Sequence, residues 1–150
     1  MLFRSSVRFI ALIMLIGLGF VSLNSQASTS VPTLSIEFHE ASQAYALGDY
    51  VTAYKMFLPM AEQGNVFAQF ALGQIYRFGQ GREINFAPSL YWYQQAAKQE
   101  YGVAQSHLGE MYLQGLGTEP DKVQAAYWFN RACENRCSEG CKNLAALSNE

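Results

Sequence analysis

Hydrophobic residues recur at intervals of three and four over much of the chain, which is the spacing of one face of an α-helix. In the stretch Phe67–Phe78, positions 68, 72, 75 and 76 fall on one face. Gly79 and Gly81 follow this stretch and favour a turn, and Asn85 then stands where a side chain would cap the next helix. The pattern predicts two helices joined by a glycine-containing connection.

The same pattern returns after 36 residues. When residues 68–96 are aligned with residues 104–132, 11 of 29 positions are identical, whereas about 2 would match by chance. The repeated residues include Gly73 and Gly109, for which we predict a close approach of neighbouring helices. They also include a Tyr-Trp pair, and we expect Tyr91, Trp92, Ala96 and Ala97 to form the buried face of the second helix.

Partial copies of the pattern flank the two full ones. An earlier copy contains Gly48-Asp49-Tyr50, and Asp49 is expected to cap a helix that Pro59 should kink or end early. A half copy closes the chain, with Leu144 in the place of Leu108. We therefore predict one repeat domain over residues 34–150, with units at 34–63, 64–99 and 100–135 and a half unit at 139–148. Stacking of several helix pairs buries the apolar face that a single pair would leave exposed to solvent.

The string A-x3-L-G-x2-Y-x2-G-x-G, followed by Tyr-Trp-aromatic-x2-Ala, resembles the Sel1-like repeat. It stands at Ala68–Ala96 and again at Ala104–Ala132, while the shorter copy at residues 34–63 resembles the related tetratricopeptide repeat. The resemblance implies an all-α fold, a right-handed α-solenoid of antiparallel helix pairs with a concave face. It also implies a role in binding proteins.

One stripe of residues on the first helices is the predicted binding surface. It lies opposite the predicted core positions, and stacking would align it along the concave face. It consists of Phe70, Gln74, Arg77, Ser106, Glu110 and Leu113. An aromatic ring, an arginine, a carboxylate and amides suit an extended or helical peptide, although a solvated face without a ligand stays open for each residue.

The first residues have the order of a secretory signal. Arg4 and Arg8 precede the apolar run Phe9–Val21, and small residues then lead to Ala27. We expect a signal peptide over residues 1–27, cleavage after Ala27, a flexible lead-in at residues 28–33, and a periplasmic or secreted product. A retained anchor remains the alternative, but the run is short for a membrane span, which takes about 20 residues.

Charge and motifs narrow the classes of partner and reaction. The net charge of −2 becomes −4 without Arg4 and Arg8, and no basic stripe exists, so nucleic acid is a poor partner. No stable membrane insertion is expected after signal cleavage. No Ser-x-x-Lys with Lys-Thr-Gly, no nucleophile elbow and no zincin motif occurs, so we predict neither a catalytic residue nor a cofactor.

The three cysteines stand four apart, at Cys133, Cys137 and Cys141. A zinc site would need a fourth ligand, for which only His39 and His107 are available, and we expect no metal. The string Ala132-Cys133-x7-Cys141-x2-Leu144 resembles the cysteine-bearing branch of Sel1-like proteins, the helicobacter cysteine-rich proteins. That resemblance implies a disulfide between Cys133 and Cys141, and export permits it. Cys137 is then a free thiol, a thiol that links to a partner, or a replacement for one of the two.

Three functions follow as hypotheses. The first is a non-catalytic periplasmic adaptor or regulator that binds a protein or peptide on its concave surface. The second is a structural accessory of an envelope machine, such as a flagellar motor or a polysaccharide exporter. The third is a β-lactam-hydrolysing enzyme, an activity described for the cysteine-bearing branch, and the missing serine-enzyme motifs weigh against it.

Overall fold

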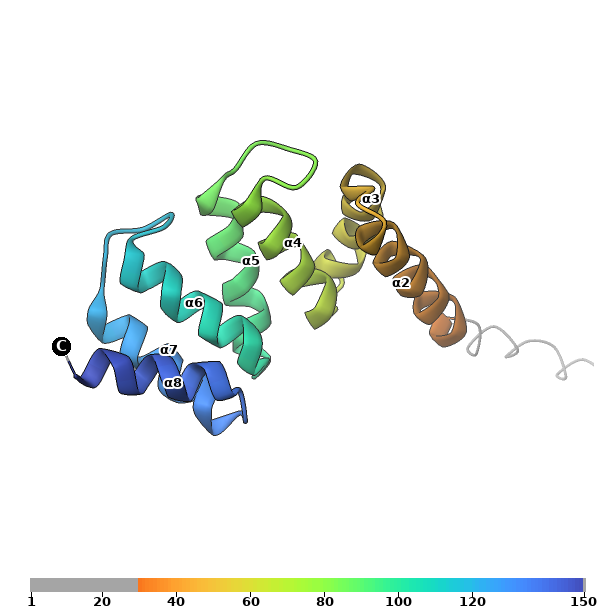
Figure 1. Ribbon diagram of the computed structural model, residues 1–150. Coiled ribbons are helices and arrows are strands. Elements are labelled where there is room, and N and C mark those ends of the chain that lie inside the picture. Colours follow the sequence, from red (N-terminus) through yellow and green to blue (C-terminus); the bar gives the residue numbers. More distant parts are fainter. Residues whose placement is uncertain (1–29, 150) are drawn as a thin grey trace, which may run out of the picture. The chain divides into compact units, whose positions relative to one another are not determined.

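The structure is a computed structural model that describes residues 30–149 (Figure 1). This part of the chain contains seven helices and no strand, which confirms the predicted all-α fold. The helices are α2 (Ser30–Ala46), α3 (Tyr50–Glu62), α4 (Val66–Phe78), α5 (Phe86–Lys98), α6 (Gly102–Gln114), α7 (Lys122–Glu134) and α8 (Ser138–Ser148). The repeats lie in one compact part, Ser35–Glu150.

The predicted signal peptide, residues 1–27, lies outside the described residues. Part of the predicted lead-in, however, is helical, because α2 begins at Ser30. Pro32 does not prevent this, since it stands in the first turn, where backbone N–H groups have no partner within the helix. The structure therefore assigns helix to residues 30–33 of the predicted lead-in.

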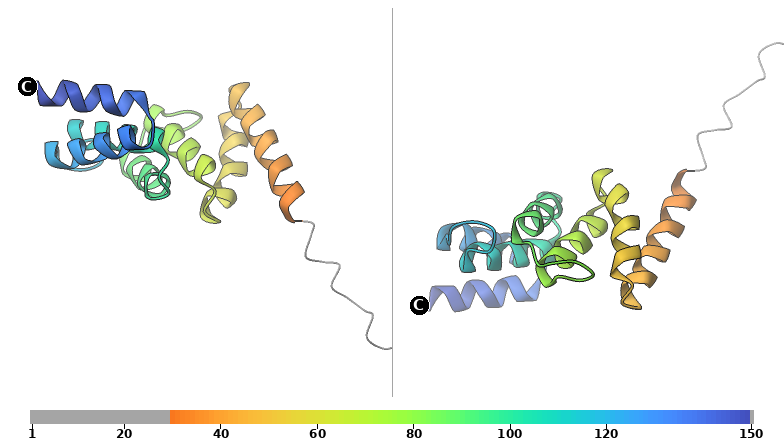
Figure 2. Two further views of the ribbon diagram at one scale, coloured as in Figure 1. Left: turned by 90° about the horizontal axis from the view of Figure 1, so that it is seen from below. Right: turned by 90° about the horizontal axis from the view of Figure 1, so that it is seen from above.

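The helices follow the 36-residue period of the sequence. The helices α4, α6 and α8 begin at residues 66, 102 and 138, and α3, α5 and α7 begin at residues 50, 86 and 122. We call α2, α4, α6 and α8 the first helices of the repeats and α3, α5 and α7 the second helices. Consecutive helices from α3 to α8 pack against one another, and the first helices α6 and α8 are also in contact (Figure 2).

The helix ends confirm Asp49 and Asn85 as capping residues, and Asp121 caps α7 in the same way. The carboxylate of Asp49, the amide oxygen of Asn85 and the carboxylate of Asp121 each accept a hydrogen bond from a backbone N–H in the first turn of the helix that follows. The first helices α4 and α6 end at Gly79 and Gly115, which have φ values of 65° and 69°. These left-handed conformations favour glycine, as the sequence indicated.

Pro59 does not end α3, which continues to Glu62. Pro59 stands in the last turn, and the buried side chains of Met60 and Ala61 immediately after it anchor that turn in the core. Packing therefore maintains the helix beyond the proline. Of the two alternatives predicted for Pro59, the early end of the helix is wrong, and a kink stays a prediction.

The core of each repeat is built from both helices of the pair. The predicted first-helix positions Ala68, Leu72 and Ile75 are fully buried, and Tyr76 is half-buried. Leu108 fills the place of Leu72 in the next repeat and is also fully buried. The 3.6-residue pattern thus identified the inner face of these helices correctly.

On the second helices, one predicted core residue is misplaced. Tyr91 is 52% exposed, whereas Tyr93 is 0% exposed. Ala96 and Ala97 are buried as predicted, and Tyr93 lies three and four residues before them, on the same helix face. Tyr91 lies off that face. Its identity with Tyr127 reflected a repeated surface position, because Tyr127 is also exposed.

Gly73 and Gly109 allow the close helix approach that their repetition predicted. A Cβ atom on Gly73 would lie 2.5 Å from two ring carbons of Tyr93, and one on Gly109 would lie 2.6 Å from two ring carbons of Phe129. Real Cβ atoms do not tolerate such contacts. Each glycine therefore makes room for the large aromatic side chain of the second helix in its own repeat.

The disulfide between Cys133 and Cys141 forms as the resemblance implied, with 4.6 Å between the two Cα atoms. Cys133 lies at the end of α7 and Cys141 in the first turn of α8. A short non-helical connection separates these helices, and Arg136 within it has a φ of 61°. Cys137 is the free thiol and stands at the N-cap position of α8.

The disulfide has an equivalent in each earlier repeat. Gln69 Nε2 donates to the backbone oxygen of Ala61 at 3.0 Å, and Gln105 Nε2 donates to that of Ala97 at 3.0 Å. At intervals of 36 residues, the third such pair is Cys133 and Cys141. A covalent bond therefore replaces a buried hydrogen bond at the last junction, where α8 has no second helix after it in the described chain.

Candidate functional site

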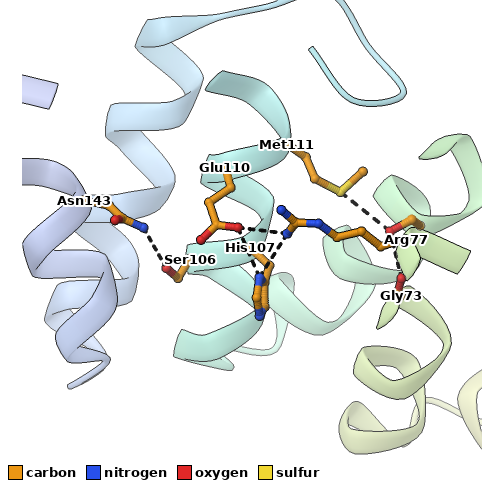
Figure 3. A network of polar contacts seen from close by, with 8 residues as sticks. Gly73, Arg77, Ser106, His107, Glu110, Met111 and Asn143 are labelled. Atoms are coloured by element: carbon orange, nitrogen blue, oxygen red, sulfur yellow. Dashed lines mark hydrogen bonds and ion pairs between the residues drawn. The ribbon is translucent and has the colours of Figure 1, made fainter. Parts of the chain in front are cut away.

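The predicted stripe lies on α4 and α6, but its six residues do not form one open groove. Phe70, Gln74, Arg77, Glu110 and Leu113 are half-buried. Ser106 is only 3% exposed. The reason is α8, which packs on α6 and brings Asn143 Nδ2 within 3.5 Å of Ser106 Oγ (Figure 3). Ser106 therefore cannot line an open groove, and we remove it from the candidate surface.

Arg77 and Glu110 join successive first helices through an ion pair. Arg77 Nη1 lies 2.9 Å from Glu110 Oε2, and the two side chains are 12% and 25% exposed. His107 Nδ1 lies 3.0 Å from the same Arg77 nitrogen and 3.3 Å from the same Glu110 oxygen (Figure 3). We call these three residues the Arg77 cluster. Sequence reasoning placed Arg77 and Glu110 on the surface as separate groups and did not foresee their pairing.

Aromatic rings pack against the Arg77 cluster on the side of its histidine. The His107 ring stacks on Tyr93, with centroids 5.4 Å apart, and on Phe70, with centroids 5.7 Å apart. Burial raises the pKa of the Tyr93 hydroxyl, against the opposing effect of the Arg77 charge. For Glu110, burial also favours the neutral acid, but hydrogen bonds and charges from His107 and Arg77 outweigh it and hold the pKa below its usual value. Glu110 is thus a carboxylate at neutral pH.

The Arg77 cluster occupies one of three equivalent places. Each place lies between successive first helices and above an aromatic residue of the second helix between them. In chain order, the aromatic residue that forms the floor of each place is Phe57, Tyr93 and Phe129. Two residues of the following first helix form one wall of each place. In the same order, these wall residues are Ala71 and Gln74, His107 and Glu110, and Asn143 and Ala146. The wall residues are largest and most polar at the central place, where the Arg77 cluster fills the space.

The place before the cluster is an aromatic hollow of about 290 Å³, which we call the α2–α4 hollow. It is lined by Phe38, Ser42, Tyr45, Phe57, Phe67, Phe70, Ala71 and Gln74. Two predicted stripe residues, Phe70 and Gln74, are among them. No charged residue of the described chain belongs to this lining, so the hollow suits an uncharged, apolar group.

The place after the cluster is a hollow of about 240 Å³, which we call the α6–α8 hollow. It is lined by Glu110, Leu113, Gln114, Phe129, Asn143, Ala146 and Leu147. The stripe residues Glu110 and Leu113 belong to this lining. The predicted surface therefore divides into two hollows of different polarity, separated by the Arg77 cluster. The sequence held the signal for this division in the differing residues at positions 71, 107 and 143.

Two further features concern the described part of the chain, residues 30–149. It contains no group of three histidine, cysteine, aspartate or glutamate side chains arranged to hold a metal ion. None of its helices combines the length and hydrophobicity needed to cross a membrane.

Comparisons with known proteins agree with this architecture. The model of the Sel1 repeat matches residues 35–65, 66–101 and 102–137. No curated protein sequence matches significantly. Among solved structures, c5321, a protective antigen of uropathogenic Escherichia coli with an SLR fold, is 30% identical, with a TM-score of 0.73 over 77% of this chain. The chain spans only 26% of c5321.

A Sel1 repeat protein from Oxalobacter formigenes is also 30% identical, with a TM-score of 0.68. That match covers 75% of this chain and 88% of the other protein. The three matched repeats include most of the residues that form both hollows and the Arg77 cluster between them. With three consecutive matches to the repeat model, this chain belongs to the Sel1 repeat family.

Proposed function

We propose that this protein is an exported adaptor or regulator that binds a segment of another protein on its first helices. Sel1 repeat proteins generally mediate protein–protein interaction. The observation that carries the proposal is the pair of hollows, whose linings contain four of the six residues of the predicted stripe. The hollows flank the Arg77 cluster, which holds a fifth stripe residue, Arg77. A partner segment that crosses the cluster would place one side chain in each hollow.

The chemistry of the hollows supports binding rather than catalysis. The α2–α4 hollow is lined mainly by aromatic rings, and the polar groups of the α6–α8 hollow are one carboxylate and two amides. Aromatic pockets of this kind hold the anchoring side chains of protein partners. Sel1 repeats are typically interaction modules.

Export rests on two independent features. The order of charged, apolar and small residues over positions 1–27 is that of a secretory signal. The disulfide between Cys133 and Cys141 is compatible with an oxidising compartment such as the periplasm. Sequencing the N-terminus of the protein recovered from periplasmic extract would test this, with Ser28 expected as the first residue. An unprocessed chain in the membrane fraction would refute cleavage.

Site-specific photo-crosslinking in the native envelope tests the binding surface. A photoreactive residue at Gln74 or Gln114 would report on one hollow each, and the same residue at the exposed positions of Tyr91 and Tyr127 would report on the second helices. We expect one and the same protein to be linked from both hollows and not from the second helices. Links from the second helices alone would refute the proposal.

A further inference from the structure

The central place between the first helices shows which chemical group fills a space of this kind. There the guanidinium of Arg77 lies between the repeats and pairs with the carboxylate of Glu110. Building on the function proposed above, we propose that the α6–α8 hollow is a subsite for the arginine side chain of a protein partner. The partner would supply in that hollow the cation that Arg77 supplies within the chain at the central place.

None of the three residues of the Arg77 cluster has an equivalent of the same type one repeat later, at the α6–α8 hollow. At intervals of 36 residues, Leu113 replaces Arg77, Asn143 replaces His107, and Ala146 replaces Glu110. The aromatic floor is retained, because Phe129 stands in the place of Tyr93 and is 1% exposed. The hollow thus has the same kind of aromatic floor as the central place, but side chains leave a volume of about 240 Å³ unfilled.

Glu110 serves both places, through different oxygens. Its Oε2 atom makes the contacts with Arg77 and His107. Its other oxygen carries no such contact in Figure 3 and lies on the side toward α8. Because Glu110 also lines the α6–α8 hollow, this oxygen is placed to accept hydrogen bonds from a donor that enters there.

Charge and shape together select arginine. Glu110 is the one charged residue in the lining of the hollow, within the described chain, and it is negative. Leu113 and Leu147 offer apolar surface for the aliphatic part of a long side chain, and the planar guanidinium matches a carboxylate in geometry. In the α2–α4 hollow, Phe38 occupies the position that Glu110 has in the α6–α8 hollow, and uncharged Gln74 occupies the position that Glu110 has in the central place, so that hollow should not select a cation.

The test uses a small probe with the oxidised, isotope-labelled full chain in NMR titrations. The probe is N-acetyl-arginine methylamide, and the control is the citrulline analogue, which is nearly isosteric and uncharged. We expect the arginine probe to shift the backbone signals of Phe129, Asn143 and Leu147. The citrulline analogue should bind about ten-fold more weakly or worse, as expected for the loss of a charge-assisted hydrogen bond. Equal binding of both compounds would overturn the proposal.

Two matched substitutions locate the probe. Asn143→His introduces into the α6–α8 hollow the histidine that His107 provides at the central place, and it should abolish binding of the arginine probe. Ala71→His introduces a histidine at the equivalent position of the α2–α4 hollow and should leave binding of the probe unchanged. Equal loss in both variants, or in neither, would contradict the assignment. Arg77→Met provides a second control, because it removes the internal cation and keeps Glu110; binding of the arginine probe should persist or strengthen. Loss of binding in a folded Arg77→Met protein would count against the subsite.

The outcome is separable from that of the photo-crosslinking experiment. If Gln74 and Gln114 crosslink to one partner while the arginine probe does not bind, the arginine subsite is wrong and the proposed function stands. If the probe binds as described and no partner is linked from either hollow, the subsite stands and the proposed function is wrong.

Discussion

Replacing the disulfide by the hydrogen bond of the earlier repeats is the sharpest stability experiment that the structure offers. Cys133 and Cys141 occupy the positions that carry Ala97 and Gln105 one repeat earlier. The double variant Cys133→Ala/Cys141→Gln should therefore form the same side-chain hydrogen bond. The matched variant Cys133→Ala/Cys141→Ala lacks both links. A Cys137→Ser change in all proteins prevents thiol exchange.

The expected free energies follow from the loop that the bridge closes. Residues 133 to 141 form a loop of nine residues, for which the chain-entropy model gives about 2.6 kcal/mol of stabilisation. A buried hydrogen bond contributes about 1 kcal/mol. The alanine variant should thus unfold at a free energy about 2.6 kcal/mol below that of the oxidised parent. The glutamine variant should lie about 1.6 kcal/mol below the parent.

Urea unfolding followed by circular dichroism measures this order, with the parent studied both oxidised and reduced. The reduced parent should behave like the alanine variant, because neither has the covalent link. If the glutamine variant is no more stable than the alanine variant, the equivalence between the hydrogen bonds and the disulfide is wrong. If all proteins unfold at the same urea concentration, the bridge does not stabilise the fold.

Three further predictions concern the core and the Arg77 cluster. Leu108→Ala and Trp128→Ala should each lower the free energy of unfolding by about 2–5 kcal/mol, since Leu108 is fully buried and Trp128 packs on the core around it; an unmoved melting midpoint would contradict the register. Gly73→Ala should destabilise by about 1–3 kcal/mol despite its better helix propensity, because the new Cβ meets the Tyr93 ring, and a smaller residue at position 93 should reverse part of the loss. The folded-state pKa of Glu110 is lowered, so its ionised form stabilises the protein above the unfolded pKa of about 4.3 and this contribution is lost as the pH falls through the folded pKa. Urea unfolding between about pH 5 and 3 should show a shallower pH dependence in Glu110→Gln, and an unchanged dependence would contradict the role of the ion pair.

The repeat and its helix boundaries could be predicted from sequence because they depend on local signals. Caps such as Asp121 and stop signals such as Gly115 act within one turn, and the 36-residue period fixed the order of the helices. The repeated glycines Gly73 and Gly109 also predicted the close approach of helices, because the two helices concerned belong to the same repeat. Identity between repeats misled only where it marked a repeated surface position, as at Tyr91.

The candidate site was harder to predict because it depends on contacts between repeats. The helical pattern placed Ser106 on an outward stripe, but α8 covers it. Likewise, Arg77 and Glu110 lie 33 residues apart and meet only when the repeats stack. The hollows arise from differences between equivalent residues, such as Ala71, His107 and Asn143. A search for identity between repeats passes over these positions.

Binding of a partner protein in the two hollows on the first helices is best tested by the affinity of the crosslinked partner, once identified, for three variants of the full chain. Ala71→His and Asn143→His each fill one hollow, and Tyr91→Glu changes the exposed face of the second helix α5. Each histidine variant should weaken binding by about ten-fold or more, as expected when an anchoring side chain loses its pocket, while Tyr91→Glu should bind like the parent. Full affinity in both histidine variants, with loss in Tyr91→Glu, would contradict binding in the hollows.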